Sequence, residues 1–125
     1  MDADRQKPSL DAWLAEIKEG SDTAGTGMYL VHNGVVRGSS RDGRAVTSMV
    51  LSTNRVRLAE IIESARLMEG VTHIRAWVNE GSLSVGDDIM YVIVGGDIRD
   101  HVFDALGALV RMIKTEVVTE EELRP

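Results

Sequence analysis

The chain has 125 residues, of which 43% are hydrophobic and 27% charged, and this is ordinary usage for one globular domain with a buried core. Its formal net charge of −6 disfavours non-specific nucleic-acid binding, and the lack of cysteine excludes disulfides, thiolate catalysis and cysteine metal sites. No apolar run approaches the roughly 18 to 20 residues of a membrane span, and no signal peptide is recognisable, so we expect a cytoplasmic protein that does not insert into membranes.

The first half of the chain predicts one helix and two strands. Residues 9–20 begin with a serine cap, end with a glycine and carry apolar side chains at helical spacing. Residues 28–36 are rich in strand-forming side chains and predict a strand with a bulge near residues 33–34. The dipeptide Asp42 and Gly43 is a hairpin signal, so we expect residues 46–51 to return as the second strand.

The second half predicts a helix, two strands and a final helix. Residues 54–69 have helical spacing between an asparagine cap and a glycine stop, and residues 71–78 alternate as a half-buried strand does. Residues 79–88 predict a loop, and the continuous apolar run 89–94 is typical of a central strand covered on both faces. Residues 100–115 predict the last helix, with an apolar stripe formed by Phe103, Leu106, Leu109, Val110 and Ile113.

This order of elements predicts the fold class. It is typical of an α+β domain in which helices cover one side of a largely antiparallel sheet. We expect residues 1–125 to form this single domain, with flexible ends at 1–8 and 122–125.

Few titratable residues are candidates for chemistry. His32 and His73 lie in predicted strands and are better explained as structural residues than as ligands, and His101 is expected to be exposed. No two histidines have metal-ligand spacing, so we expect no bound metal. Asp87 and Asp88 follow a glycine turn, which such carboxylates usually cap.

Two cations bracket the last helix. Gly95 and Gly96 precede it, and the free amide groups at a helix amino end attract anions. Arg99 beside them would strengthen a phosphate site, although a surface arginine is the simpler interpretation. Lys114 at the carboxyl end is either a functional amine or a cation that complements the helix dipole, an effect of a few tenths of a kcal/mol to about 1 kcal/mol.

Three blocks of the sequence resemble the large subunit of molybdopterin synthase, the MoaE family. They are Gly27–Arg37 (GMYLVHNGVVR), Glu80–Asp88 (EGSLSVGDD) and Ile98–Lys114 (IRDHVFDALGALVRMIK), in the order of that family. The resemblance implies an α/β hammerhead fold and a central homodimer. It also implies a small ubiquitin-like partner, a MoaD-like sulfur carrier, whose C-terminal thiocarboxylate gives its sulfur to cyclic pyranopterin monophosphate.

The resemblance also implies the site residues. Lys114 matches the catalytic lysine, and Arg37 and Arg99 match arginines that bind the substrate. A lysine desolvated by Ile113 and Val117 would lose its proton more easily and serve as an acid–base group or an amine nucleophile. Arginines stay charged and suit the phosphate of the pterin. No cofactor is implied, because the pterin phosphate is the substrate.

The distance between Arg99 and Lys114 adds a constraint. Fifteen residues along a straight helix span about 22 Å, so one small substrate cannot touch both side chains in one chain. If both serve one site, Arg99 comes from a second copy, which predicts a homodimer with two composite sites and, with the small subunit, a heterotetramer.

The chain departs from the family pattern at four positions. Ile98 replaces a histidine, Val78 and Asn79 replace a His-Arg pair, and Glu121 falls where a second functional lysine is expected. Two hypotheses therefore stay open: a synthase that works with Lys114, Arg37 and Arg99, or a non-catalytic dimeric module that binds a ubiquitin-like sulfur carrier. A domain with an unrelated ligand is a third, less favoured hypothesis.

Overall fold

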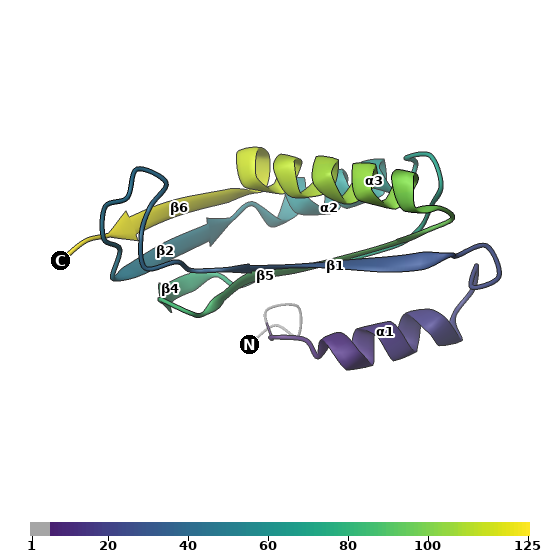
Figure 1. Ribbon diagram of the computed structural model, residues 1–125, viewed down its shortest axis with the longest axis horizontal. Coiled ribbons are helices and arrows are strands. Elements are labelled where there is room, and N and C mark those ends of the chain that lie inside the picture. The colour runs from purple at the N-terminus through teal and green to yellow at the C-terminus, as the bar shows by residue number, and fades with distance from the viewer. Residues whose placement is uncertain (1–5) are drawn as a thin grey trace.

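The structure, a computed structural model, describes residues 6–125 and has two three-stranded antiparallel sheets with three α-helices (Figure 1). In the first sheet β5 (Asp88–Gly96) lies between β1 (Met28–Val35) and β3 (Val71–Val78). In the second sheet β2 (Ser48–Thr53) lies between β4 (Gly81–Ser84) and β6 (Val118–Leu123). The helices are α1 (Leu10–Glu19), α2 (Arg55–Ala65) and α3 (Arg99–Met112), and the π-helical turn η2 (Ile113–Val117) continues α3. The α+β fold class is confirmed.

The helices lie on both faces of the first sheet, so the expectation that they cover one side is wrong. In Figure 1, α1 lies on one side of this sheet and α3 and α2 lie on the other. Glu16 of α1 forms an ion pair with Arg75 of β3, and Lys18 lies over the ring of Tyr29 of β1. The cause is that every residue of β5 after Asp88 is buried, which requires cover on both faces.

The predicted hairpin between residues 28–36 and 46–51 is also wrong. The pairing of β1 with β5 becomes irregular between Gly34 and Val35, and the chain then leaves the first sheet. Within the intervening loop only the bridge between Ser39 and Ala45 has hairpin character. The next strand, β2, pairs with β4 and β6 in the second sheet. The irregularity expected near residues 33–34 is seen as a register shift between Gly34 and Val35, but the residue without a partner is Ile89 of β5, so the extra residue is not in β1.

Two strands of the second sheet are absent from the sequence-based prediction. β4 lies in the segment that we expected to be a loop, and Leu83 is its only buried residue. β6 has the sequence VTEEEL and is exposed after Val118. Both lie at the edges of the sheet, where short and charged strands are common, and neither has the apolar pattern that predicts a strand.

Described residues near both ends of the chain contact the rest of the domain. Glu122 and Leu123 lie in β6, and the carbonyl of Leu123 accepts a hydrogen bond from the Thr47 amide at 2.9 Å, whereas the flexible end expected at 122–125 stays a prediction. At the other end, residues 1–5 lie outside the described range, and Lys7 forms an ion pair with Asp88. This ion pair and hydrogen bonds from Tyr91 and Asn33 lower the pKa of Asp88 to about 2.

The core lies between the first sheet and α2 and α3. The buried stripe of α3 begins at Val102, whereas Phe103, which we expected in the stripe, is 52% exposed. The stripe is therefore displaced by one residue at its start, and its buried members are Val102, Ala105, Leu106 and Leu109. Within residues 6–125, none of the helices has the length and apolar character needed to cross a membrane.

Gly95 and Gly96, which precede the last helix in the sequence, are the last two residues of β5. A Cβ atom on Gly96 would lie 2.7 Å from the Gly70 carbonyl oxygen and 2.7 Å from a methyl group of Val102. A Cβ atom on Gly95 would lie 2.7 Å from the ring of Tyr29. These two glycines therefore allow α3 and the neighbouring strands to approach β5 closely.

We predict opposite effects for two Gly→Ala substitutions. Gly96→Ala should lower the free energy of unfolding by about 1–3 kcal/mol, because the new methyl group overlaps backbone and Val102. Gly107→Ala should raise it by about 0.5–1 kcal/mol, because position 107 is inside α3 and the new methyl group would have no other part of the protein, apart from the surrounding helix backbone, within 4 Å. Urea unfolding followed by circular dichroism measures both, and equal effects would contradict the packing described for Gly96.

Candidate functional site

The best candidate site is a cleft of about 660 Å³ where the end of β1, the loop after it, η2 and β6 meet. Arg37 and Lys114 both line it, so two of the three predicted site residues share one cleft. Val35, Met49 and Ile89 supply apolar surface. We call this site the basic cleft, because five cations line it with three acids: Arg37, Arg41, Arg44, Lys114 and Arg124, with Asp42, Glu120 and Glu122.

The π-helical turn η2 positions Lys114. Ile113 and Val117 on either side of it are buried in the core, which turns the Lys114 side chain outwards into the basic cleft. There the Lys114 ammonium forms an ion pair with Glu120 of β6. The side chain remains 39% exposed, so the expectation of an amine desolvated by its apolar neighbours is wrong. A carboxylate, and not apolar burial, is its immediate environment.

Arg37 lies two residues after the irregular end of β1. The amide of Val36 donates to the Asp87 carbonyl at 3.0 Å, and the Val36 side chain is buried in the core. This anchors the chain just before Arg37, whose side chain is exposed at the rim of the basic cleft. The anchoring of Val36 therefore directs Arg37 to the site.

Arg99 does not reach the basic cleft. It is the first residue of α3, whereas Lys114 is the second residue of η2, beyond the carboxyl end of that helix. The amino end of α3 is occupied by Asp97, which accepts hydrogen bonds from the Ile98 amide at 2.6 Å and from His101 Nδ1 at 2.8 Å. The hydrogen bond with Asp97 raises the pKa of His101 and lowers that of the Asp97 carboxyl. An anion bound at this helix end would therefore meet a carboxylate already in place.

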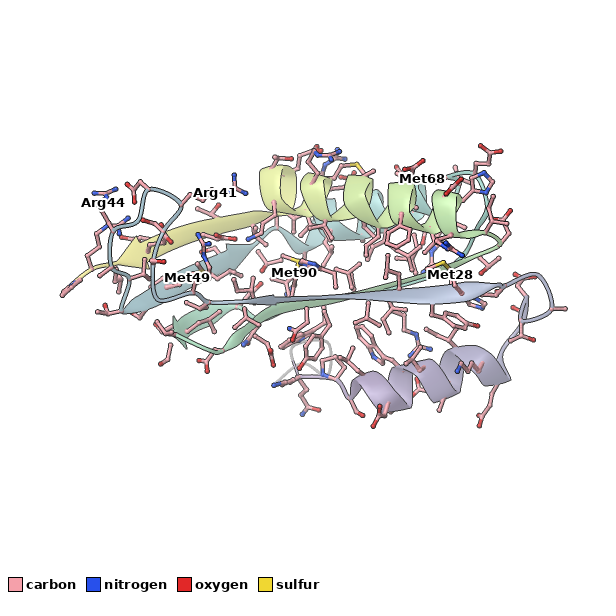
Figure 2. The ribbon with its side chains drawn as sticks, in the orientation of Figure 1. Met28, Arg41, Arg44, Met49, Met68 and Met90 are labelled. Atoms are coloured by element: carbon pink, nitrogen blue, oxygen red, sulfur yellow. The ribbon has the colours of Figure 1, made fainter. Side chains whose placement is uncertain are left out.

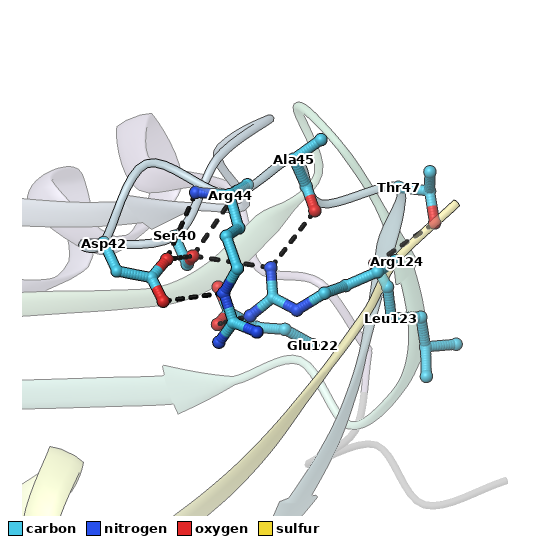
Figure 3. Close-up of polar contacts among 8 residues, drawn as sticks. All are labelled: Ser40, Asp42, Arg44, Ala45, Thr47, Glu122, Leu123 and Arg124. Carbon is cyan, nitrogen blue, oxygen red and sulfur yellow. Dashed lines mark hydrogen bonds and ion pairs between the residues drawn. The ribbon is translucent and has the colours of Figure 1, made fainter.

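The loop between β1 and β2 supplies residues that the sequence analysis did not single out. Arg41 and Arg44 lie in this loop, and Arg124 is the residue that follows β6. Figure 3 shows how Asp42 joins Ser40 and Arg44, while Arg124 donates to the carbonyl of Ala45 at 3.1 Å. The hydrogen bonds from Ser40 and Arg44 lower the pKa of the Asp42 carboxyl. The sequence pattern that could have indicated these residues is the pair Arg41 and Arg44 on either side of the Asp42–Gly43 turn signal.

Glu121 does not line the basic cleft. In the pairing of β2 with β6, Glu121 lies opposite Val50, whereas Glu120 and Glu122 lie opposite Leu51 and Met49. Since alternate residues of a strand face opposite sides, Glu121 faces away from the side that carries Glu120 and Glu122. The anion that meets Lys114 is therefore Glu120 and not Glu121.

His32 is a second residue of interest near Lys114. Burial lowers the pKa of its imidazole, and the positive charge of Lys114 lowers it further. Its Nε2 atom is buried and has no hydrogen-bond partner within residues 6–125. Among residues 6–125, no group of three or more histidine, aspartate or glutamate side chains is arranged to hold a metal ion.

The comparisons with known proteins agree with this geometry. The chain matches the family model described as MoaE protein over residues 4–116, and it therefore belongs to the MoaE family. Membership of this family, whose members are large subunits of molybdopterin synthase, assigns the chain to molybdenum cofactor biosynthesis. A sequence comparison with curated proteins found no match.

Solved structures of this family have the same fold. Molybdopterin synthase from Staphylococcus aureus superposes with a TM-score of 0.75 at 18% identity, covering 95% of this chain and 88% of that one. The MoaE protein from Burkholderia ambifaria gives 0.72 at 20% identity, covering 96% and 82%. A complex of subunits 1 and 2 of the molybdopterin-converting factor from Helicobacter pylori gives 0.68 at 14% identity, covering 94% and 80%.

We predict that His32 reports on the charge of Lys114. The pKa of His32, measured by NMR titration of its ring signals, should lie below 6.5 and should rise in Lys114→Gln, because that change removes the positive charge. Arg99→Gln removes a charge at the far end of α3 and should leave the His32 titration unchanged. If the pKa of His32 were the same in the wild type and in Lys114→Gln, the two side chains would not be neighbours.

Proposed function

We propose that this chain is the large subunit of a molybdopterin synthase that transfers sulfur to cyclic pyranopterin monophosphate. The donor is the C-terminal thiocarboxylate of a small, MoaD-like sulfur carrier. The observation that carries the proposal is that Arg37 and Lys114 line one cleft in a chain of the MoaE family. A module that only binds the sulfur carrier would not need an amine and a guanidinium to meet there, so this alternative is less favoured.

The chemistry of the cleft fits the two substrates. Its apolar surface, with Val35, Met49 and Ile89, suits the flat pterin ring, and its cations suit a phosphate and a thiocarboxylate. Lys114 can act as an acid–base group or as an amine nucleophile toward the carbonyl carbon of the tail. Glu120 holds the Lys114 ammonium until the substrates arrive. We expect neither a metal nor a cofactor to be needed for this transfer.

We also propose how the assembly forms. The Helicobacter pylori structure is a complex of two subunits of the molybdopterin-converting factor, and we propose an equivalent small partner for this chain. Because Arg99 and Lys114 lie at opposite ends of the helical segment, we propose that Arg99 reaches the basic cleft of a second copy. The active form would then be a heterotetramer built on a homodimer. We place it in the cytoplasm, with which the cysteine-free sequence is compatible.

We predict that reconstitution will detect this activity. The purified chain, mixed with a thiocarboxylated small subunit and cyclic pyranopterin monophosphate, should form molybdopterin, measured as its fluorescent oxidation product. Lys114→Ala should lower the rate by about 100-fold or more, because it removes the reacting group. Lys18→Ala on α1 removes an equal charge outside the cleft and should leave the rate unchanged. Absence of product with the wild type, or full activity of Lys114→Ala, would refute the assignment.

We predict that the sites are composite. Arg99→Ala and Lys114→Ala should each be inactive alone, whereas dimers that combine one chain of each should contain one intact site. Co-expression of the two variants with random pairing should therefore restore about a quarter of the wild-type activity. If Arg99 and Lys114 acted within one chain, the mixed dimer would contain no intact site. No recovery in a mixture shown to contain mixed dimers would contradict the shared site.

A further inference from the structure

The cations of the basic cleft differ in how far their charge is already balanced. Arg44 forms an ion pair with Asp42 at 2.7 Å, Arg124 forms one with Glu122 at 3.6 Å, and Lys114 pairs with Glu120. Each of the three acids of the cleft therefore forms an ion pair with one of these cations. Neither Arg37 nor Arg41 forms an ion pair with any residue in the range 6–125. The cleft therefore has two guanidinium groups whose charge is open to a ligand.

The loop that carries Arg41 is held by contacts of its own. The Ser40 amide donates to the Arg44 carbonyl at 2.9 Å, and the Gly43 amide donates to the Ser40 carbonyl at 2.9 Å. Asp42 joins the side chains of Ser40 and Arg44, and Arg124 ties the loop to β6 (Figure 3). Arg41 is thus presented from an organised turn, which lowers the entropic cost of binding a ligand there.

Arg41 and Arg44 extend to different sides of this loop. Figure 2 shows Arg41 extending from the loop towards the carboxyl end of α3, and Arg44 on the side of the loop remote from α3. The turn η2, which contains Lys114, follows that end of α3. Arg41 and Lys114 line the same cleft. The direction of the side chain and its unbalanced charge therefore both select Arg41 among the cations of the loop.

We propose that Arg41 and Arg37 together bind the phosphate of the pterin substrate, so that the phosphate lies beneath the loop and the pterin lies over Val35 and Ile89 towards Lys114. This inference rests on the proposed function and adds the orientation of the substrate. A cyclic phosphate offers two unesterified oxygens that share one negative charge, and a guanidinium fork matches such a pair of acceptors. Arg44 and Arg124 are less suited, because a phosphate would have to compete with Asp42 and Glu122.

Arg41 also supplies a positive charge in place of a lysine that this sequence lacks. The resemblance to the MoaE family implied a second lysine at position 121, where this chain has a glutamate that faces away from the cleft. Arg41 supplies a positive charge from the loop between β1 and β2, and this charge balances the negative charge of the substrate without a lysine on β6. The loop therefore replaces β6 as the source of that positive charge.

Substrate binding tests the proposal directly. Cyclic pyranopterin monophosphate is titrated into the wild type and into Arg41→Gln, and binding is followed by calorimetry. Arg41→Gln should weaken binding by about 10- to 100-fold, as expected for the loss of a charge-assisted contact. Arg41→Lys, which keeps the charge but loses the fork, should fall between the two. In the reconstituted reaction Arg41→Gln should raise KM and leave kcat within about twofold, because uniform binding and not the reacting group is lost.

Arg66→Gln is the matched control. It removes the same charge from the end of α2, outside the cleft, where Arg66 pairs with Glu63. It should bind and react as the wild type does. Wild-type binding by Arg41→Gln, or an equal loss in Arg66→Gln, would overturn the role of Arg41 even if the synthase reaction is observed.

A second measurement separates this inference from the proposed function. If the wild type neither binds the pterin nor forms molybdopterin, the synthase assignment fails. Inorganic phosphate, followed by ³¹P NMR, then tests the anion site alone. Phosphate binding that is lost in both Arg41→Gln and Arg37→Gln but kept in Arg66→Gln would support the arginine pair, and the lack of any difference among the three would refute it.

Discussion

The burial of β5 on both faces is the constraint on which the rest of the structure depends. Eight of its nine residues are buried, so the strand needs cover from α1 on one face and from α2 and α3 on the other. Gly96 lets α3 approach closely, and the apolar side of α3 then continues into Ile113 and Val117 of η2. Because these two residues are held in the core, the Lys114 side chain between them points out of the core, where it meets Glu120.

The second sheet completes the site by supplying charge. β6 follows η2 directly and pairs with β2, which places Glu120 beside Lys114 and Arg124 beside the loop after β1. That loop returns Arg41 and Arg44 to the same cleft, while the irregularity at Gly34 and Val35 directs Arg37 there. Segments far apart in the sequence thus contribute charges to one cleft, and most of these charges are balanced within it. The balance matters for function, because only the unbalanced cations can bind an anionic substrate without first losing a partner.

The departures from the family pattern have a different meaning in three dimensions. Glu121 replaces an expected lysine, yet it faces away from the cleft, and the neighbouring Glu120 contacts Lys114. Ile98 replaces an expected histidine at the far end of α3, whereas His32, which was interpreted as structural, carries a buried and unpartnered Nε2 atom close to the charge of Lys114. A substitution in a motif therefore has to be judged from the direction of the side chain as well as from its type.

The sequence by itself determined the class of fold, the family and most elements of the first sheet, because periodicity and glycine or asparagine caps are local signals. It also identified Arg37 and Lys114 through motifs, and the fold brings these two together. Only the tertiary structure decided that α1 covers the opposite face, that β2 pairs with β4 and β6, and that Phe103 is exposed. It alone shows Glu120, Arg41 and Arg124 in the cleft. These features depend on contacts between distant segments, for which polar, exposed edge strands and loops leave no local pattern in the chain.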